Sequence, residues 1–168
     1  PSRPFFLSLG FLAAHPPFQP PAFYFERYLR TGVPEPLIGD WAQSPWPDQL
    51  GSEDHVCACN TDLPPEAQLC MQAAYYGMLN HVDDQLRRLI NPIKGIGHRR
   101  DTIIIFTSDH GEMLGDHYRF RKQLAYEGAA RVPFLLSAPP RFGVDKGRVS
   151  DTVATHADIM PTILDMLN

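Results

Sequence analysis

The sequence predicts an α/β fold, and three segments carry that prediction. Residues 103–106 (Ile-Ile-Ile-Phe) form a short apolar run, which is typical of a strand buried on both faces of a parallel sheet. Residues 66–90 place an apolar side chain at every third or fourth position, as expected for the buried stripe of a long helix. Residues 132–136 form another apolar run and predict a second strand.

The other elements can be predicted in chain order. Residues 4–14 are largely apolar and predict an early strand, which ends at His15 and two prolines that favour extended backbone. Residues 31–65 contain six prolines and two tryptophans, which indicates a long ordered loop at the rim of an active site. The long helix should begin just after the prolines at the end of that loop.

The C-terminal half adds a loop and a helix. Residues 112–122 connect the strand at 103–106 to the strand at 132–136 and predict a loop. A final helix is predicted over residues 158–167, with Pro161 in its first turn, where proline is tolerated.

Polar side chains follow the 103–106 strand at its carboxyl end, where ligands bind in open α/β sheets. Asp109 offers carboxylate oxygen and His110 offers imidazole nitrogen, so this pair could hold a divalent cation. Gly111 allows a sharp turn or a close approach of the backbone to a ligand.

Positive charge follows the Asp-His pair in the sequence. Lys122 and two nearby arginines could face a tetrahedral anion. A metal-ligand pair followed by cationic side chains suits sulfuryl or phosphoryl transfer, in which positioned charge supplies most of the catalysis. His117 lies in the same segment, and we expect it to make structural hydrogen bonds rather than to bind metal.

These motifs resemble those of the sulfatase family, within the alkaline-phosphatase superfamily. Residues 107–112 (Thr-Ser-Asp-His-Gly-Glu) resemble its second metal-binding motif, and residues 122–133 resemble its active-site lysine and the strand after it. The segment ending at His15 resembles a strand that ends in a substrate-binding histidine, and residues 75–83 resemble the helix before the metal strand. Residues 158–162 (Asp-Ile-Met-Pro-Thr) resemble the late helix. Since five motifs keep the family's order and separations, the resemblance covers nearly the whole chain.

The resemblance implies an alkaline-phosphatase-like three-layer α/β/α sandwich. The sandwich would be partial, because the sequence is expected to be truncated at both ends, and residues 1–168 would form part of a sulfatase catalytic domain. The implied activity is that of a sulfuric ester hydrolase of the arylsulfatase type, which cleaves a sulfate monoester in the full-length enzyme.

The resemblance also implies roles for individual residues. Asp109 and His110 would bind one divalent cation, calcium first, with manganese or zinc as alternatives for a site that contains histidine. Lys122 would neutralise charge on the sulfuryl oxygens. His15 would contact the oxygen that bridges to the leaving group and could protonate it.

Two family elements have no counterpart before His15. Sulfatases attack with a formylglycine, which is made from the first residue of a Cys/Ser-x-Pro-x-Arg motif near the start of the domain, and an early strand supplies an Asp-Asp pair to the metal. We therefore expect formylglycine in a preceding segment, and the isolated chain to be inactive. Residues 137–141 (Ser-Ala-Pro-Pro-Arg) match the motif literally, but they lie downstream of the metal strand. We interpret that match as a coincidence of a short pattern.

The composition narrows the function classes. A length of 168 residues allows one ordinary domain. The net charge of −4 gives no reason to expect nucleic acid, and no apolar stretch is long enough to cross a bilayer. Three cysteines cannot pair off completely, so a disulfide framework is not expected. A small-molecule sulfate ester is the expected partner, and cytoplasmic or exported location and oligomeric state stay open.

Two other functions fit the same residues. A phosphonate monoester hydrolase or phosphodiesterase of the same superfamily carries similar Asp-His-Gly and lysine elements. A catalytically inactive sulfatase-like domain would lack the nucleophile altogether. The loop at residues 31–65 holds no readable code for the leaving group, so aryl, sugar and choline esters all stay open.

Overall fold

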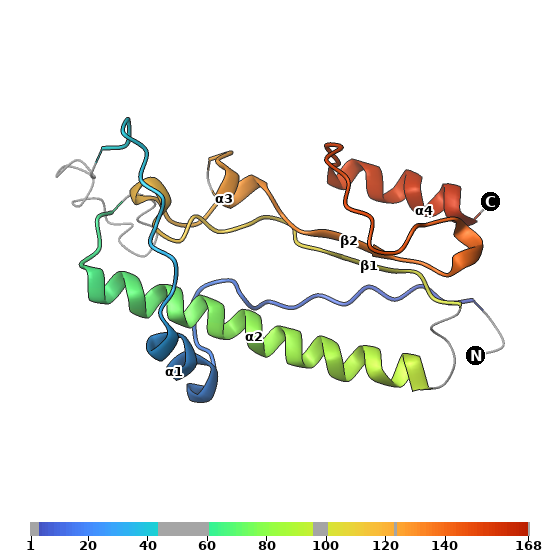
Figure 1. Cartoon of the computed structure of the whole chain (residues 1–168), viewed down its shortest axis with the longest axis horizontal. Coiled ribbons are helices and arrows are strands. Elements are labelled where there is room, and N and C mark those ends of the chain that lie inside the picture. The colour runs from blue at the N-terminus through green and yellow to red at the C-terminus, as the bar shows by residue number, and fades with distance from the viewer. Residues whose placement is uncertain (1–3, 44–60, 96–100, 123, 168) are drawn as a thin grey trace. The chain divides into compact units, whose positions relative to one another are not determined.

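The computed structural model describes residues 4–43, 61–95, 101–122 and 124–167 (Figure 1). Its helices are α1 (Ala22–Thr31), α2 (Pro65–Gly95), α3 (Glu127–Ala130) and α4 (Ile159–Leu167). Its strands are β1 (Ile104–Thr107) and β2 (Phe134–Ser137). Short 3-10 helices are η4 (Asp116–Tyr118), η5 (Pro140–Phe142) and η6 (His156–Asp158). The chain forms two compact units, the first from residues 1–89 and 114–120 and the second from residues 90–113 and 121–168.

The first unit is built on the long helix α2. The prediction of this helix is confirmed, and it continues a few residues beyond the expected end to Gly95. Its central apolar positions are buried, among them Ala73 and Met78. The predicted stripe is wrong at Leu79 and Leu89, which are 41% and 37% exposed, whereas Val82 and Leu86 between them are partly buried. Periodicity identifies the helix, but it does not show how far along the helix a partner covers it.

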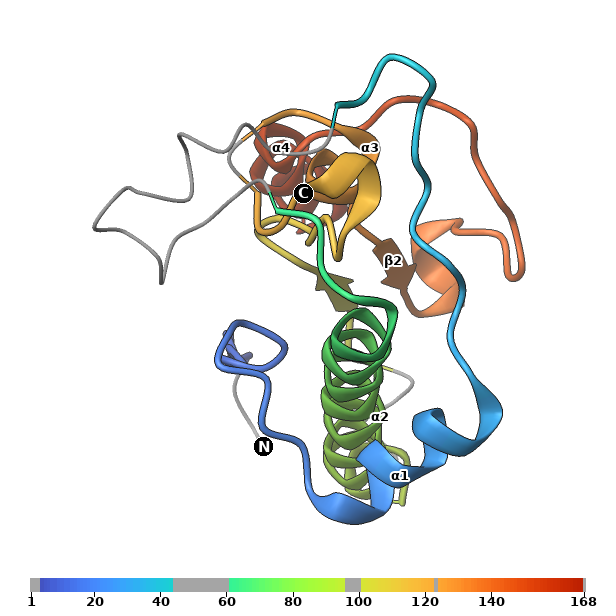
Figure 2. The ribbon, with the colours of Figure 1, turned by 90° about the vertical axis from the view of Figure 1, so that its left-hand side faces the viewer.

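Helix α1 packs beside α2 in both views of the ribbon (Figures 1 and 2). The rings of Tyr28 and Tyr76 lie 5.5 Å apart between their centroids. Gly77 allows the close approach, because a Cβ there would lie 3.2 Å from the backbone nitrogen of Phe25. The sequence predicted no element at α1, which begins after Pro21 without a side-chain N-cap. The absence of a capping residue explains why this short helix gave little local signal.

The second unit contains the two strands, which pair antiparallel with Ile104 opposite Ser137 and Thr107 opposite Phe134. Both strands were predicted within about two residues of their observed bounds, but the expectation of a parallel sheet is wrong for this pair. An apolar run carries no information on the direction of the neighbouring strand. All four residues of β1 are partly buried.

Other predictions have mixed outcomes. Residues 4–14, which the structure describes, form no strand, so that prediction is wrong; an apolar extended segment becomes a strand only when a ladder of backbone hydrogen bonds forms. The helix predicted at residues 158–167 is confirmed as η6 and α4. Residues 32–43 and 61–64 of the predicted loop contain no helix or strand, and residues 44–60 lie outside the described part of the chain. Within the described residues, no helix has the length and apolar character needed to span a membrane.

Candidate active site

The residues after β1 form a tight turn that presents Asp109 and His110. The Ser108 hydroxyl donates to the His110 carbonyl at 2.8 Å, and the His110 N–H donates to Asp109 Oδ1 at 3.0 Å. The structure brings the two predicted metal ligands together, with Asp109 Oδ2 3.5 Å from His110 Nε2. The Asp109 side chain is 84% exposed and that of His110 is 31% exposed. The turn therefore offers an oxygen and a nitrogen side by side at the strand end.

The orientation of the imidazole determines which nitrogen can act as a ligand. His110 Nδ1 lies 2.8 Å from the Gly111 carbonyl oxygen. Since a carbonyl only accepts, Nδ1 carries the proton in this contact, and the lone pair of the neutral ring is on Nε2. Metal-binding histidines commonly donate from the second nitrogen to a backbone carbonyl in this way. The donor set of the turn thus fits a divalent cation.

The spacing of the two ligand atoms fits the same interpretation. Two ligands that bind one Ca²⁺ at about 2.3–2.6 Å and at right angles lie about 3.3–3.7 Å apart. The 3.5 Å between Asp109 Oδ2 and His110 Nε2 lies in that range. No group of three or more His, Cys, Asp or Glu residues that could hold a metal occurs among the residues described by the structure. Asp109 and His110 offer two ligand atoms to a cation.

The surroundings of Asp109 favour its charged form. Desolvation by burial, the largest single influence, raises the pKa of this carboxyl. The His110 N–H, the His110 charge, the backbone N–H of Asp109 itself and the Ser108 hydroxyl together outweigh it, so that the pKa lies below its ordinary value. Asp109 is consequently ionised at neutral pH, as a carboxylate that binds a cation would need to be.

Helix α3 holds the other side of the turn. The Gly111 N–H donates to the Ala129 carbonyl at 2.7 Å, and a Cβ on Gly111 would lie only 2.1 Å from the Gly128 carbonyl oxygen. Gly111 was predicted to allow a sharp turn or a close approach to a ligand. It does allow a close approach, and the neighbouring group in this structure is the backbone of α3. Met113 and Ala129 are buried beside this contact, which makes it part of the small core of the second unit.

Lys122 directly follows Arg121, whose backbone is hydrogen-bonded to the residues after the Asp-His turn. The Met113 N–H donates to the Arg121 carbonyl at 3.0 Å, and the Arg121 N–H donates to the Glu112 carboxylate. These bonds fix the residue before Lys122 against the two residues that follow Gly111. The Lys122 side chain is half-buried in a bend of the chain. Its role as an anion contact stays a prediction.

The segment between Met113 and Lys122 is strained. Four residues other than glycine have positive φ angles: Leu114 at 50°, His117 at 54°, Tyr118 at 61° and Arg121 at 67°. Each such residue costs about 1–2 kcal/mol relative to ordinary backbone, and strain of this kind concentrates at functional sites. Sequence reasoning missed this strain, because leucine, tyrosine and arginine do not favour the left-handed region and only His117 is of a type enriched there.

Residues 114–120 of this segment belong to the first unit, in which hydrogen bonds join them to the loop at residues 37–39. Asp116 Oδ1 accepts a hydrogen bond from the Leu37 N–H at 2.8 Å, and His117 Nδ1 accepts from the Gly39 N–H at 3.0 Å. The Trp41 ring lies 4.6 Å from the His117 ring between centroids. The hydrogen-bonding role predicted for His117 is confirmed, and the equal importance of Asp116 was missed because its partner is far away in the sequence.

His15 belongs to the first unit and lies in the turn before Pro16 and Pro17. Its side chain is exposed, and its Nδ1 lies 2.7 Å from the Pro16 carbonyl oxygen. Nδ1 therefore donates to that carbonyl. The predicted contact between His15 and the substrate stays a prediction.

Ser137 lies at the far end of the strand pair from the candidate site. It pairs with Ile104, whereas Thr107, beside the Asp-His turn, pairs with Phe134. Three residues of strand, about 10 Å, separate Ile104 from Thr107. This distance supports the interpretation of the serine motif as a coincidence.

Comparison with known proteins identifies the family. The sulfatase family model matches residues 1–168. The chain belongs to the sulfatase family. This sulfatase chain is 42% identical over 166 residues to an arylsulfatase of Clostridium perfringens, an alignment that covers 98% of this chain and 34% of that protein. It is 33% identical over 178 residues to a multifunctional alkaline phosphatase superfamily protein of Trinickia caryophylli, covering 98% of this chain and 34% of that protein.

A solved structure shows the same fold for the sulfatase chain. The phosphonate monoester hydrolase of Agrobacterium radiobacter superposes with a TM-score of 0.76 and 31% sequence identity, covering 94% of this chain and 33% of that one. The fold is therefore part of an alkaline-phosphatase-like α/β domain, as the sequence predicted. The chain spans about a third of the length of the curated relatives it matches.

Proposed function

We propose that the intact protein is a sulfuric ester hydrolase that cleaves a sulfate monoester with the help of one divalent cation. The observation that carries the proposal is the Asp109–His110 pair, whose oxygen and nitrogen ligand atoms lie 3.5 Å apart at the end of β1. The 42% identity over 166 residues to an arylsulfatase supports a sulfate ester as the substrate.

In this proposal, Asp109 and His110 hold the cation, calcium first and manganese or zinc as alternatives. A bound divalent cation would polarise a sulfate oxygen and lower the proton affinity of the nucleophile. The lowered pKa of Asp109 keeps the carboxylate charged for this task. The His110 ring is held by its bond to the Gly111 carbonyl, so that Nε2 keeps its direction. A formylglycine from a segment outside residues 1–168 would be the nucleophile.

The proposed anion contact is Lys122, whose ammonium group would neutralise charge as it develops on the sulfuryl oxygens. Two hydrogen bonds of the Arg121 backbone limit the movement of this residue, which directly precedes Lys122. They support a fixed position for the Lys122 ammonium group. His15 would contact the bridging oxygen. Because its Nδ1 donates to the Pro16 carbonyl, donation from Nε2 to the leaving group would require the protonated ring.

A phosphonate monoester hydrolase is the second candidate function. It is favoured by the structural likeness to the Agrobacterium radiobacter enzyme of that name, which has a TM-score of 0.76. The two candidates differ in the transferred group, sulfuryl in one and phosphonyl in the other. Both would use a metal, an anion contact and the same strand-end turn, so the substrate preference is what separates them.

The test measures kcat/KM of the intact protein for an aryl sulfate, an aryl phosphonate monoester and an aryl phosphate diester under identical conditions. A sulfatase should prefer the sulfate by at least about tenfold, a difference of about 1.4 kcal/mol in transition-state binding. Asp109→Asn should lower kcat/KM for the preferred ester by about 10² or more, as loss of one preorganised electrostatic contact typically does. Asp145→Asn, which removes the same charge from an exposed position in the second unit, is the matched control. Preference for the phosphonate would replace the first candidate by the second, and an unaffected Asp109→Asn enzyme would refute both.

A further inference from the structure

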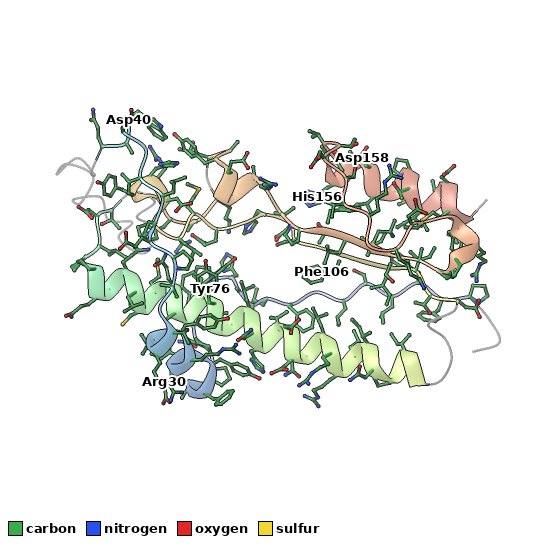
Figure 3. The ribbon with its side chains drawn as sticks, in the orientation of Figure 1. Arg30, Asp40, Tyr76, Phe106, His156 and Asp158 are labelled. Carbon is green, nitrogen blue, oxygen red and sulfur yellow. The ribbon has the colours of Figure 1, made fainter. Side chains whose placement is uncertain are left out.

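The turn with the two proposed metal ligands has a contact from a distant part of the chain. His156 lies in η6, directly before α4, and its Nε2 is 2.7 Å from the carbonyl oxygen of Ser108. Figure 3 shows this histidine beside the end of β1 that follows Phe106. Since the carbonyl only accepts, His156 Nε2–H is the donor. Ser108 immediately precedes Asp109, so the histidine holds the peptide group from which the first ligand extends.

The backbone that carries His156 is itself fixed. The Thr155 N–H and hydroxyl both donate to Asp158 Oδ2, at 2.6 Å and 3.1 Å, and the Asp158 N–H returns to the Thr155 carbonyl at 3.0 Å. The bond from the Thr155 N–H to the Asp158 carboxylate belongs to a capping box, whereas the bond from the Asp158 N–H to the Thr155 carbonyl is a backbone bond of the 3-10 turn; together they hold the first turn of the helix. The His156 imidazole therefore extends from a turn that is held by several hydrogen bonds.

The proposed ligand pair stands between two anchors. On one side the Ser108 carbonyl accepts from His156, and on the other the Gly111 N–H donates to the Ala129 carbonyl. Between these points, local hydrogen bonds join Asp109 and His110 to each other and to their immediate neighbours. Without the first anchor, the Ser108 peptide group could rotate and carry Asp109 away from His110.

We propose that His156 is a positioning residue for the metal site, acting through the Ser108 carbonyl on the direction of the Asp109 carboxylate. The inference rests on the proposed function, because it needs Asp109 and His110 to be the metal ligands. Residues that orient metal ligands from outside the ligand set typically change metal affinity or activity by 10- to 100-fold when removed. Both the neutral Nε2–H tautomer and the cation can donate, so the contact does not depend on the charge of the ring.

Substitutions at position 156 separate positioning from simple packing. His156→Leu keeps the bulk and removes the donor. His156→Gln keeps an amide N–H₂ near the position of Nε2, whereas the shorter His156→Asn places its amide nearer to Nδ1 and cannot reach the carbonyl in the same way. His81→Leu makes the same change in the first unit, where the ring stacks on Tyr24, and serves as the matched control.

The experiment uses the intact protein and titrates Ca²⁺ and, separately, Mn²⁺ while aryl sulfate turnover and melting temperature are followed. His156→Leu and His156→Asn should raise the metal concentration for half-maximal activity by about 10- to 100-fold, and His156→Gln should stay within about threefold of wild type. His81→Leu should lower the melting temperature without moving the metal requirement. If His156→Leu does not fold, the Gln and Asn variants, which are similar in polarity, decide the question by themselves.

Two results would overturn the inference. The first leaves the proposed function standing, and the second also refutes the proposed metal site. If Asp109→Asn abolishes metal-dependent activity while the Leu, Asn and Gln variants at 156 all keep the wild-type metal requirement, His156 is not a positioning residue and the proposed function stands. If Asp109→Asn also leaves metal dependence unchanged, the proposed metal site is wrong and the role of His156 falls with it.

Discussion

Replacing Gly111 by alanine should push the Asp-His turn away from helix α3. The added Cβ would lie 2.1 Å from the Gly128 carbonyl oxygen, 3.1 Å from the Gly128 carbonyl carbon and 3.3 Å from the Ala129 carbonyl oxygen. Carbon and oxygen atoms in ordinary contact are about 3.5 Å apart or more. The obstacle is backbone rather than the end of a flexible side chain, so the turn or α3 must move by more than about 1 Å.

The cost of Gly111→Ala has two parts. Overpacking of a closely packed contact costs about 1–3 kcal/mol. The hydrogen bond from the Gly111 N–H to the Ala129 carbonyl, 2.7 Å long, crosses the same contact and cannot survive that displacement. Its loss adds about 1 kcal/mol. The free energy of unfolding should therefore fall by about 2–4 kcal/mol, and metal affinity should fall with it because Asp109 and His110 lie on the displaced turn.

Gly128→Ala is the matched control. A Cβ at Gly128 would lie 3.3 Å from the Glu112 carbonyl oxygen and from Met113 Sδ, and a small shift of the methionine can relieve the second contact. Gly128 lies inside α3, where alanine is favoured over glycine by about 1 kcal/mol. Urea unfolding of the intact protein, with a metal titration of each variant, measures both effects. A Gly111→Ala protein as stable as Gly128→Ala, with unchanged metal affinity, would refute the argument that α3 supports the turn.

Three further predictions concern charge. Lys122→Ala should slow the chemical step by about 10²–10³ while the melting temperature barely changes, and Arg121→Ala should be far milder, which kcat and melting curves for an aryl sulfate will check. The hydrogen bond from Tyr24 is the largest influence that lowers the pKa of Asp84. Its contribution to the free energy of unfolding is therefore fully present above the unfolded-state pKa of about 4, and this contribution is lost as the pH falls through the lower pKa of the folded state. The stability difference between wild type and Tyr24→Phe, measured by denaturation at several pH values, should therefore shrink below about pH 4, and a constant difference would contradict the assignment. Treatment with a chelator should abolish turnover, and added Ca²⁺ or Mn²⁺ should restore it.

The sequence predicted the elements whose signals are local. The period of apolar residues in α2 repeats over many turns, and the apolar runs of β1 and β2 are bounded by polar residues, so their positions were close to those observed. The proximity of Asp109 and His110 at the end of β1 also follows from local sequence, because the two residues are adjacent and directly follow the strand, while their role as metal ligands stays a prediction.

What the sequence could not predict depends on partners that are distant along the chain. The direction of β2 relative to β1 depends on the path of the connecting chain, and residues 4–14 lack the ladder that would make them a strand. Asp116 was missed because its partner is the backbone of Leu37, 79 positions away. His156 was missed for the same reason, because it is 48 positions from Ser108. Residue type and spacing reveal none of these contacts.

The contacts of the Asp-His turn with His156 and with α3 bear on the affinity of the proposed metal site rather than on which atoms would bind the metal. A short motif specifies which atoms can bind, and here it names an oxygen and a nitrogen in adjacent residues. Affinity requires in addition that those atoms keep their directions when the cation is absent, since any freedom must be lost on binding. At an exposed carboxylate such as Asp109, the contacts to α3 and to His156 on either side of the turn would add to the rigidity that local hydrogen bonds supply. If the proposed metal site is right, two sulfatases with the same Asp-His-Gly motif should bind metal with different strength when these two contacts differ.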